Sequence, residues 1–191
     1  ILQECSPMLG ELCKKSAGDD VVTTVPITDV KPDIFRHLLY YIYGGEVPDG
    51  DLKANAKDII DAADKYGVAN LKLEAEACFV NSTPITIDNM MGNLLDADAK
   101  NCALLKEAVM DFIVENGMEV YEKISFENIP GNLMKDLLSP MNRVKKKDAD
   151  GESGNHLGIM RINDLRRKLD EKGLDVDGSR ETMIATLKEN S

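Results

Sequence analysis

The residues that could carry out acid–base chemistry are few in this 191-residue sequence. Histidine is the usual general base near neutral pH, and the chain has two, His37 and His156. His37 stands beside apolar residues in an expected helix, so a part-buried or surface position accounts for it better than catalysis does. His156 stands in a polar stretch with few apolar neighbours. Neither histidine predicts a catalytic centre.

The other signatures of enzymes are missing from the sequence. It contains no glycine-rich phosphate loop, dinucleotide-binding glycine pattern, HExxH zinc motif or GxSxG nucleophile turn. Acidic pairs such as Asp19-Asp20, or Glu74 with Glu76, are typical of solvated helix faces. The chain is therefore predicted not to be an enzyme, and to use no cofactor and no small-molecule substrate.

The cysteines also predict no metal site or disulfide. They are scattered without CxxC spacing, and each lies among apolar residues, which indicates reduced thiols in the core. The four positions are Cys5, Cys13, Cys78 and Cys102.

A formal net charge of −11 argues against nonspecific binding of the whole chain to nucleic acid or to an anionic membrane. No apolar run approaches the roughly 20 residues that cross a bilayer. Binding to other proteins is the function class that remains.

Helical periodicity dominates residues 33–139, where apolar residues recur every three or four positions. Asp33 is expected to cap the first of these helices, and Gly67 to end the second. Strand signals are rare, since only residues 21–27, VVTTVPI, are β-branched enough to pair at a sheet edge. The sequence predicts a mainly α fold with a small β element.

The composition changes after residue 142. Residues 143–159 combine a short basic run with Asp, Gly, Ser and Asn, which predicts a flexible linker. Residues 160–191 hold seven basic and seven acidic residues, and their sparse apolar positions predict a helix–turn–helix hairpin. The hairpin is expected to be a separately tethered module.

Two stretches, ITDVKPDIFRHLLYYIYGGEVPDG and DIIDAADKYGVANLKLEAEACF, resemble the second half of a BTB/POZ domain, and CSPMLGEL resembles the helix end that precedes it. The closest likeness is to the speckle-type POZ group. The resemblance implies that residues 1–82 are the C-terminal part of a BTB/POZ fold without its first strands, a truncated BTB/POZ fold. It also implies that residues 83–142 are helices of the 3-box or BACK-like extension.

The function implied by this resemblance is that of an adaptor that forms homodimers or hetero-oligomers and recruits a cullin scaffold of a ubiquitin ligase. In the family a loop carries a hydrophobic residue, any residue and then Glu, and that loop aligns here with Ala17-Gly18-Asp19. The expected cullin-binding residues are Ala17, Gly18, Asp19, Tyr41 and Tyr66.

The hairpin resembles a second family, the SAP motif. The pattern L-x-x-x-L, then G-L, then G-x-[KR] is matched by Leu165, Leu169, Gly173-Leu174 and Gly178-Ser179-Arg180. Gly173 suits the left-handed position after a helix, and Ser179 suits an N-cap. In that family the start of the second helix binds DNA. The expected nucleic-acid-binding residues are Lys172, Gly178, Ser179, Arg180 and Lys188.

Two hypotheses follow. The first is a non-enzymatic, cullin-recruiting adaptor that the SAP-like hairpin targets to DNA, chromatin or another partner. The alternative is a chromatin-associated scaffold or transcriptional regulator that binds no cullin. Either protein is expected in the nucleus, the cytoplasm or both, because no targeting segment is recognised.

Overall fold

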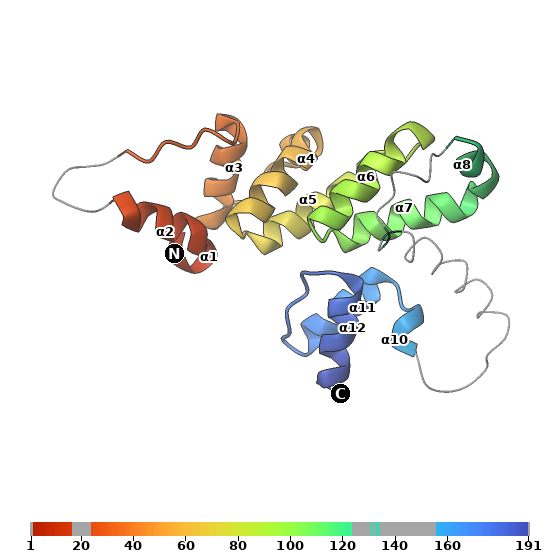
Figure 1. Ribbon diagram of the computed structural model, residues 1–191. Helices are drawn as coiled ribbons and strands as arrows, with labels where there is room; N and C mark the ends of the chain where they lie inside the picture. The colour runs from red at the N-terminus through yellow and green to blue at the C-terminus, as the bar shows by residue number, and fades with distance from the viewer. Residues whose placement is uncertain (1, 17–23, 124–130, 132, 134–155, 191) are drawn as a thin grey trace. The chain divides into compact units, whose positions relative to one another are not determined.

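The computed structural model describes residues 2–16, 24–123, 131, 133 and 156–190. The chain divides into two compact units, residues 1–83 and residues 84–191. The described residues of both units form helices, and no strand occurs among them (Figure 1). The strand expected at residues 21–27 is therefore absent from 24–27, while 21–23 lie outside the described residues. A lone strand has no partner for its backbone groups, and no described segment supplies one.

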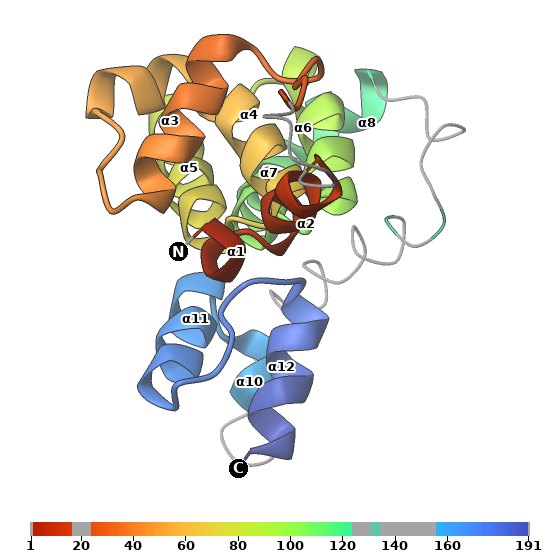
Figure 2. The ribbon, with the colours of Figure 1, turned by 90° about the vertical axis from the view of Figure 1, so that its left-hand side faces the viewer.

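The first unit is a set of short helices in which α4 and α5 pack most extensively against each other. Figure 2 shows α3, α4 and α5 beside one another. The helices are α1 (Leu2–Cys5), α2 (Pro7–Ser16), α3 (Pro32–Ile42), α4 (Asp49–Tyr66) and α5 (Ala69–Ser82).

Helix α3 begins with proline rather than with the expected Asp33 cap. Lys31 is the N-cap residue and Pro32 takes the first helical positions, where its missing N–H is not needed. Asp33 lies in the first turn, where a carboxylate favours the positive end of the helix dipole. Gly44, with φ +88°, follows the last turn. The face of α3 that packs into the core carries Ile34, Leu38 and Ile42.

Helix α4 ends at Gly67, as the sequence predicts. Gly67 has φ +69°, a left-handed conformation that glycine adopts without a Cβ clash. The N–H of Val68 donates to the carbonyl oxygen of Ala63 at 2.8 Å, which closes the helix end. The tight turn sends α5 back along α4. Fully buried side chains between the helices of this unit include Leu38, Ile59, Tyr66 and Leu71.

A buried serine ties the beginning of the unit to the end of α4. Ser6 lies between α1 and α2 and has no exposed surface. Its hydroxyl donates to the carbonyl oxygen of Tyr66 at 2.5 Å and accepts from the N–H of Leu9 at 3.3 Å. The bond satisfies a carbonyl that the helix end leaves unpaired.

The second unit combines a helical pair with the C-terminal hairpin. Its helices are α6 (Ile87–Ala99), α7 (Ala103–Glu115), α8 (Gly117–Lys123), α10 (His156–Ile159), α11 (Ile162–Glu171) and α12 (Arg180–Glu189). At 156–159 the structure differs from the predicted linker, because these residues form α10, and Leu157 packs against the apolar core of the hairpin. The rest of the predicted linker, residues 143–155, lies outside the described residues.

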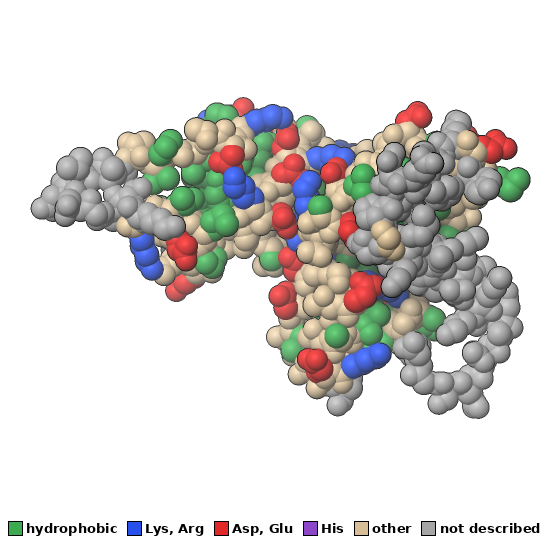
Figure 3. Space-filling model, in the orientation of Figure 1, with side chains coloured by type: hydrophobic (Ala, Val, Ile, Leu, Met, Phe, Trp, Pro, Cys, Tyr) green, Lys and Arg blue, Asp and Glu red, His purple; other side chains and the backbone are tan. Residues whose placement is uncertain are grey.

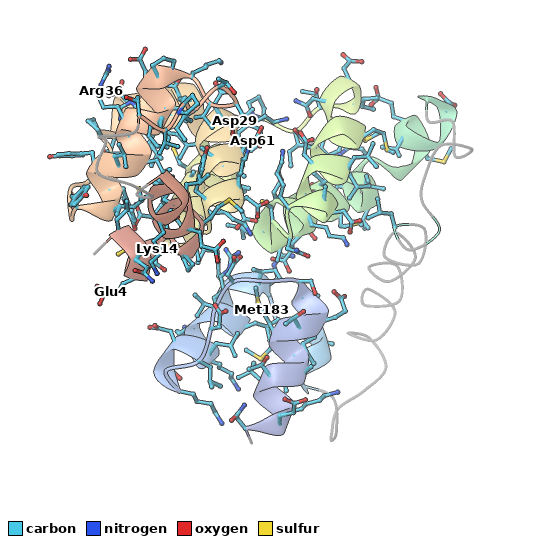
Figure 4. The ribbon with its side chains drawn as sticks, turned by 60° about the vertical axis from the view of Figure 1, so that its left-hand side comes forward. Glu4, Lys14, Asp29, Arg36, Asp61 and Met183 are labelled. Atoms are coloured by element: carbon cyan, nitrogen blue, oxygen red, sulfur yellow. The ribbon has the colours of Figure 1, made fainter. Side chains whose placement is uncertain are left out.

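The hairpin core is apolar and includes a residue of α7. Figure 4 shows Met183 of α12 between α11 and α12. The buried cluster consists of Ala103, Met160, Ile162, Leu165, Leu169, Met183 and Leu187. Each fully buried Leu or Met contributes about 1.5–3 kcal/mol. Because Ala103 belongs to the cluster, the hairpin packs on α7, which differs from the separately tethered module that the sequence predicts.

Candidate functional site

Of the two histidines, His37 in α3 is the one whose side chain the structure describes. His37 is partly buried, and its Nε2 lies 3.9 Å from a carboxylate oxygen of Asp51. Within the described parts of the chain, no group of three or more His, Cys, Asp or Glu side chains could hold a metal ion. None of the helices in the described residues combines the length and the apolar composition that a bilayer crossing needs.

The structure corrects two expectations about buried side chains. Cys102 is buried, but Cys5 and Cys13 are exposed, so these two are not the core thiols that their apolar neighbours predict. Glu76 is fully buried rather than solvated, because it lies one turn from Lys72 on the face of α5 that packs inward. The Nζ of Lys72 in turn lies 3.0 Å from the carboxylate of Asp64, so the buried ammonium has an ionic partner.

A small pocket of about 210 Å³, lined mostly by charged residues, lies where the segment before α3 meets α4. Asp29 and Asp61 both line it and lie close together in Figure 4. Lys65 bonds to Asp29, which lowers the pKa of the Asp29 carboxyl and raises that of the ammonium. Lys31 bonds to Asp58 at 2.6 Å. These ion pairs join the segment before α3 to α4.

The predicted cullin-binding residues fall in different environments. Ala17, Gly18 and Asp19 lie outside the described residues. Tyr41 is part-buried, and its hydroxyl donates to Glu74 Oε1 at 2.6 Å. Burial is the main cause of the raised pKa of Tyr41, and the bond to Glu74 raises it further. Tyr66 is 1% exposed, with its hydroxyl 3.3 Å from a carboxylate oxygen of Asp29, and burial raises its pKa too. Tyr66 offers almost no surface to a partner.

Two tyrosines that the sequence reading overlooked lie on the surface at the end of α3. Tyr40 and Tyr43 are 58% and 64% exposed. A Cβ added to Gly45 would come within 2.4 Å of the Tyr40 ring, so the missing side chain of Gly45 makes room for that ring. The helical spacing of Ile34 and Leu38 places Tyr40 off the buried face, and this signal could have identified it.

Apolar side chains also gather between α2 and α3 on the face of the first unit drawn in Figure 3. Met8 of α2 is one of the exposed large hydrophobic residues, at 47%. Together with Tyr40 and Tyr43 it gives this unit exposed apolar surface of the kind found at protein interfaces.

The hairpin has the local geometry that its glycines and serine predict. Gly173 has φ +66° after α11, and Gly178 has φ +124° before α12. The Ser179 hydroxyl accepts from the N–H of Thr182 at 3.2 Å, which caps α12. Lys172 and Lys188 are exposed, and the Lys172 ammonium donates to the carbonyl oxygen of Asn190 at 2.5 Å.

Arg180 is part-buried and already engaged within the chain. Its guanidinium lies 3.4 Å from Glu107 Oε1 of α7 and donates to the carbonyl oxygens of Gly158, at 3.1 Å, and Met160. Glu107 also lies 3.4 Å from the guanidinium of Arg161. Sequence reasoning missed Glu107, because no local pattern links it to residues far along the chain.

A second acidic residue of α7 holds Arg161. The Arg161 guanidinium bonds to Asp111 at 2.5 Å, and this bond raises its pKa. Asp111 and Glu107 are four residues apart and therefore share one face of α7. That face meets the beginnings of α11 and α12, so the hairpin presents its basic end to α7.

Comparison with protein families identifies the first unit. Residues 1–83 match the family model of the BTB/POZ domain. The first unit is a BTB/POZ domain. BTB/POZ domains typically oligomerise and bind partner proteins. The sequence interpretation of this unit as a protein-interaction module is therefore confirmed, without the identity of the partner. The likeness to the speckle-type POZ group and the SAP resemblance of the hairpin stay predictions.

Similar curated proteins carry the same domain in their names. The chain is 28% identical over 129 residues to mouse TD and POZ domain-containing protein 1 and to a protein 1-like relative, matches that cover 68% of this chain and 35% of each relative. It is 29% identical over 120 residues to mouse TD and POZ domain-containing protein 4, covering 63% and 32%. The chain thus spans about a third of these relatives. The longer alignments exceed the BTB/POZ match and so extend into the second unit.

Proposed function

We propose that this chain is a non-enzymatic adaptor that uses its BTB/POZ domain to bind a cullin scaffold and so recruits a substrate to a ubiquitin ligase. The observation that carries the proposal is the BTB/POZ match over residues 1–83 together with two exposed tyrosines at the end of α3. Aromatic side chains are enriched among residues that dominate binding energy. The proposal places the protein in the nucleus or the cytoplasm.

The contact surface in this proposal is centred on Tyr40 and Tyr43. Tyr41 stands between them in the sequence, and its hydroxyl is bonded to Glu74. In the proposal Tyr41 therefore fixes the position of this segment and does not contact the cullin directly. The loop at residues 17–19 stays part of the proposal through the family resemblance alone. Self-association through the same domain would present two such surfaces in one assembly.

The test is a pull-down of the full chain with purified cullin scaffolds, followed by titration of any that bind. We expect Tyr43→Ala to weaken binding by tenfold or more, about 1.4 kcal/mol or above, as for an interface hot spot. Tyr43→Phe is the matched control, because it keeps the ring and should retain most of the affinity. Failure of the folded wild-type chain to bind any cullin would refute the ligase role.

A second candidate function is nucleic-acid binding by the hairpin. It is supported by the left-handed Gly173, the Ser179 cap and the exposed Lys172 and Lys188, which together match the SAP-like pattern. The test is titration of a short A·T-rich duplex at several salt concentrations, since phosphate contacts weaken as salt rises. Absence of binding at low salt, by the unaltered chain and by a Glu107→Gln variant alike, would remove this candidate and leave the adaptor role untouched.

A further inference from the structure

The end of the hairpin that carries Arg180 is closed by an acidic side chain of α7. Both carboxylate oxygens of Glu107 accept from the N–H of Ile162, Oε2 at 3.2 Å and Oε1 at 3.3 Å. Oε2 also lies 3.4 Å from the Arg161 guanidinium, and Oε1 lies 3.4 Å from that of Arg180. The Glu107 side chain is 7% exposed and that of Arg180 is 13% exposed. Two guanidinium groups and a helix N-terminal amide therefore converge on one buried carboxylate.

These groups are the ones that bind phosphate in other proteins. The first amides of a helix and an arginine fork both favour anions. Ile162 is the first residue of α11 and Arg180 is the first residue of α12. These groups thus form an anion-binding site, and the carboxylate of Glu107 is the anion that fills it.

The loop between the two helices is satisfied in the same way. The Asp175 carboxylate accepts from the N–H of Asp177 at 3.0 Å, and the Asp177 carboxylate accepts from the N–H of Gly178 at 2.9 Å. Asp177 and Gly178 thus have their amides bonded to carboxylates of the same turn. Acidic side chains therefore accept from two amides of this turn, as Glu107 accepts from the amide of Ile162.

We infer that Glu107 is an intramolecular competitor that closes the anion site of the hairpin, so that a nucleic-acid phosphate binds Arg180 and Ile162 only by displacing it. The inference rests on the second candidate function above. When only the open fraction of a protein can bind, its apparent dissociation constant rises in inverse proportion to that fraction. Nucleic-acid binding by the unaltered chain is then weak, and it strengthens when the contact between Glu107 of α7 and Arg180 of the hairpin is broken.

The experiment compares the full chain with its Glu107→Gln variant in titrations with a fluorescent, short A·T-rich duplex. Glutamine keeps an acceptor for the Ile162 N–H but removes the charge that holds Arg180. We expect the variant to bind about fivefold more tightly, the fold-change that corresponds to about 1 kcal/mol less free energy for opening the site. The slope of log affinity against log salt should steepen by about 0.9, because one more phosphate is neutralised.

Two further variants separate this effect from a simple change of net charge. Glu119→Gln removes the same charge from an exposed position in α8 and should leave affinity close to that of the wild type. Adding Arg180→Gln to Glu107→Gln should abolish the gain, because the liberated guanidinium is the group that binds. Equal gains from Glu107→Gln and Glu119→Gln would overturn the inference.

A measurement on the unaltered chain covers the case in which Glu107→Gln fails to fold. Saturating duplex should speed hydrogen exchange at the Gly158–Met160 segment that Arg180 holds, and binding without any such change would overturn the inference. If neither wild type nor variant binds duplex at low salt, the inference and the nucleic-acid candidate both fail. If the wild type binds and Glu107→Gln adds nothing, only the inference fails.

Discussion

Glu107, Arg180 and Arg161 make contacts of unequal strength, and the structure predicts their order. A hydrogen bond to a charged group contributes about 1.5–3 kcal/mol and a neutral one about 0.5–1.5 kcal/mol. Glu107→Gln keeps the Ile162 bond, and its contacts of 3.2–3.4 Å are long, so we expect a loss of about 1 kcal/mol in the free energy of opening the hairpin.

Arg180→Gln should cost more than Glu107→Gln. It removes the same ionic contact and also the bonds to the carbonyl oxygens of Gly158 and Met160, both made by a side chain that is 13% exposed. We expect about 2–3 kcal/mol. Arg161 is 58% exposed, so Arg161→Gln should cost only about 0.2–1 kcal/mol despite its two carboxylate neighbours.

The assay is hydrogen exchange of the α11 amides in the full chain, which reports local opening directly. A double-mutant cycle between Glu107 and Arg180 should give a coupling energy of about 1 kcal/mol, since the two side chains share a buried contact. A coupling below about 0.5 kcal/mol, or a larger effect from Arg161→Gln than from Arg180→Gln, would refute the reasoning that burial sets the strength of these contacts.

Other predictions test the hairpin core, its turn and the ion pair before α3. Met183→Ala should cost about 2–5 kcal/mol because the side chain is 1% exposed, measured as faster exchange in α11 and α12; unchanged exchange would contradict the burial. Gly173→Ala should cost about 1–2 kcal/mol in the same assay, from its φ of +66° alone, since a Cβ there meets no atom within 4 Å. Lys65 lowers the pKa of Asp29, so the stability from this carboxylate is present above its ordinary pKa of 3.8 and is lost as pH falls through the lowered value. Asp29→Asn should flatten the acid limb of thermal stability against pH, and an unaltered limb would show that the pair contributes nothing.

The local features of the fold could be predicted from sequence because single residues encode them. Gly67 ends α4 and Ser179 caps α12, since each position requires a particular backbone angle or acceptor. The prediction that Asp33 caps α3 is wrong. Pro32 suits the first turn of a helix, so α3 begins earlier and Lys31 is its N-cap residue. Pro32 and Asp33 are both local signals for the start of a helix, and the apolar periodicity of the sequence does not show which of them sets it.

Features that depend on distant partners could not be predicted. Residues 24–27 have the composition of a strand, but pairing needs a second strand that no described segment supplies. Glu107 contacts Arg180, which lies 73 residues further along the chain. A pattern of charges in the sequence cannot show which residues pair over such a separation. Arg180 was therefore predicted as a free nucleic-acid contact, whereas it is engaged with α7.

The bond from Ser6 to the end of α4 bears on the order in which the BTB/POZ unit folds. It joins residues 60 positions apart, whereas the α4–α5 turn at Gly67 closes between residues a few positions apart. Short loops close at lower entropic cost than long ones, so the α4–α5 pair can form early and the N-terminal helices can dock only after Tyr66 is in place. During synthesis the first helices emerge long before that docking site exists, and their apolar side chains stay open to other partners until α4 is complete.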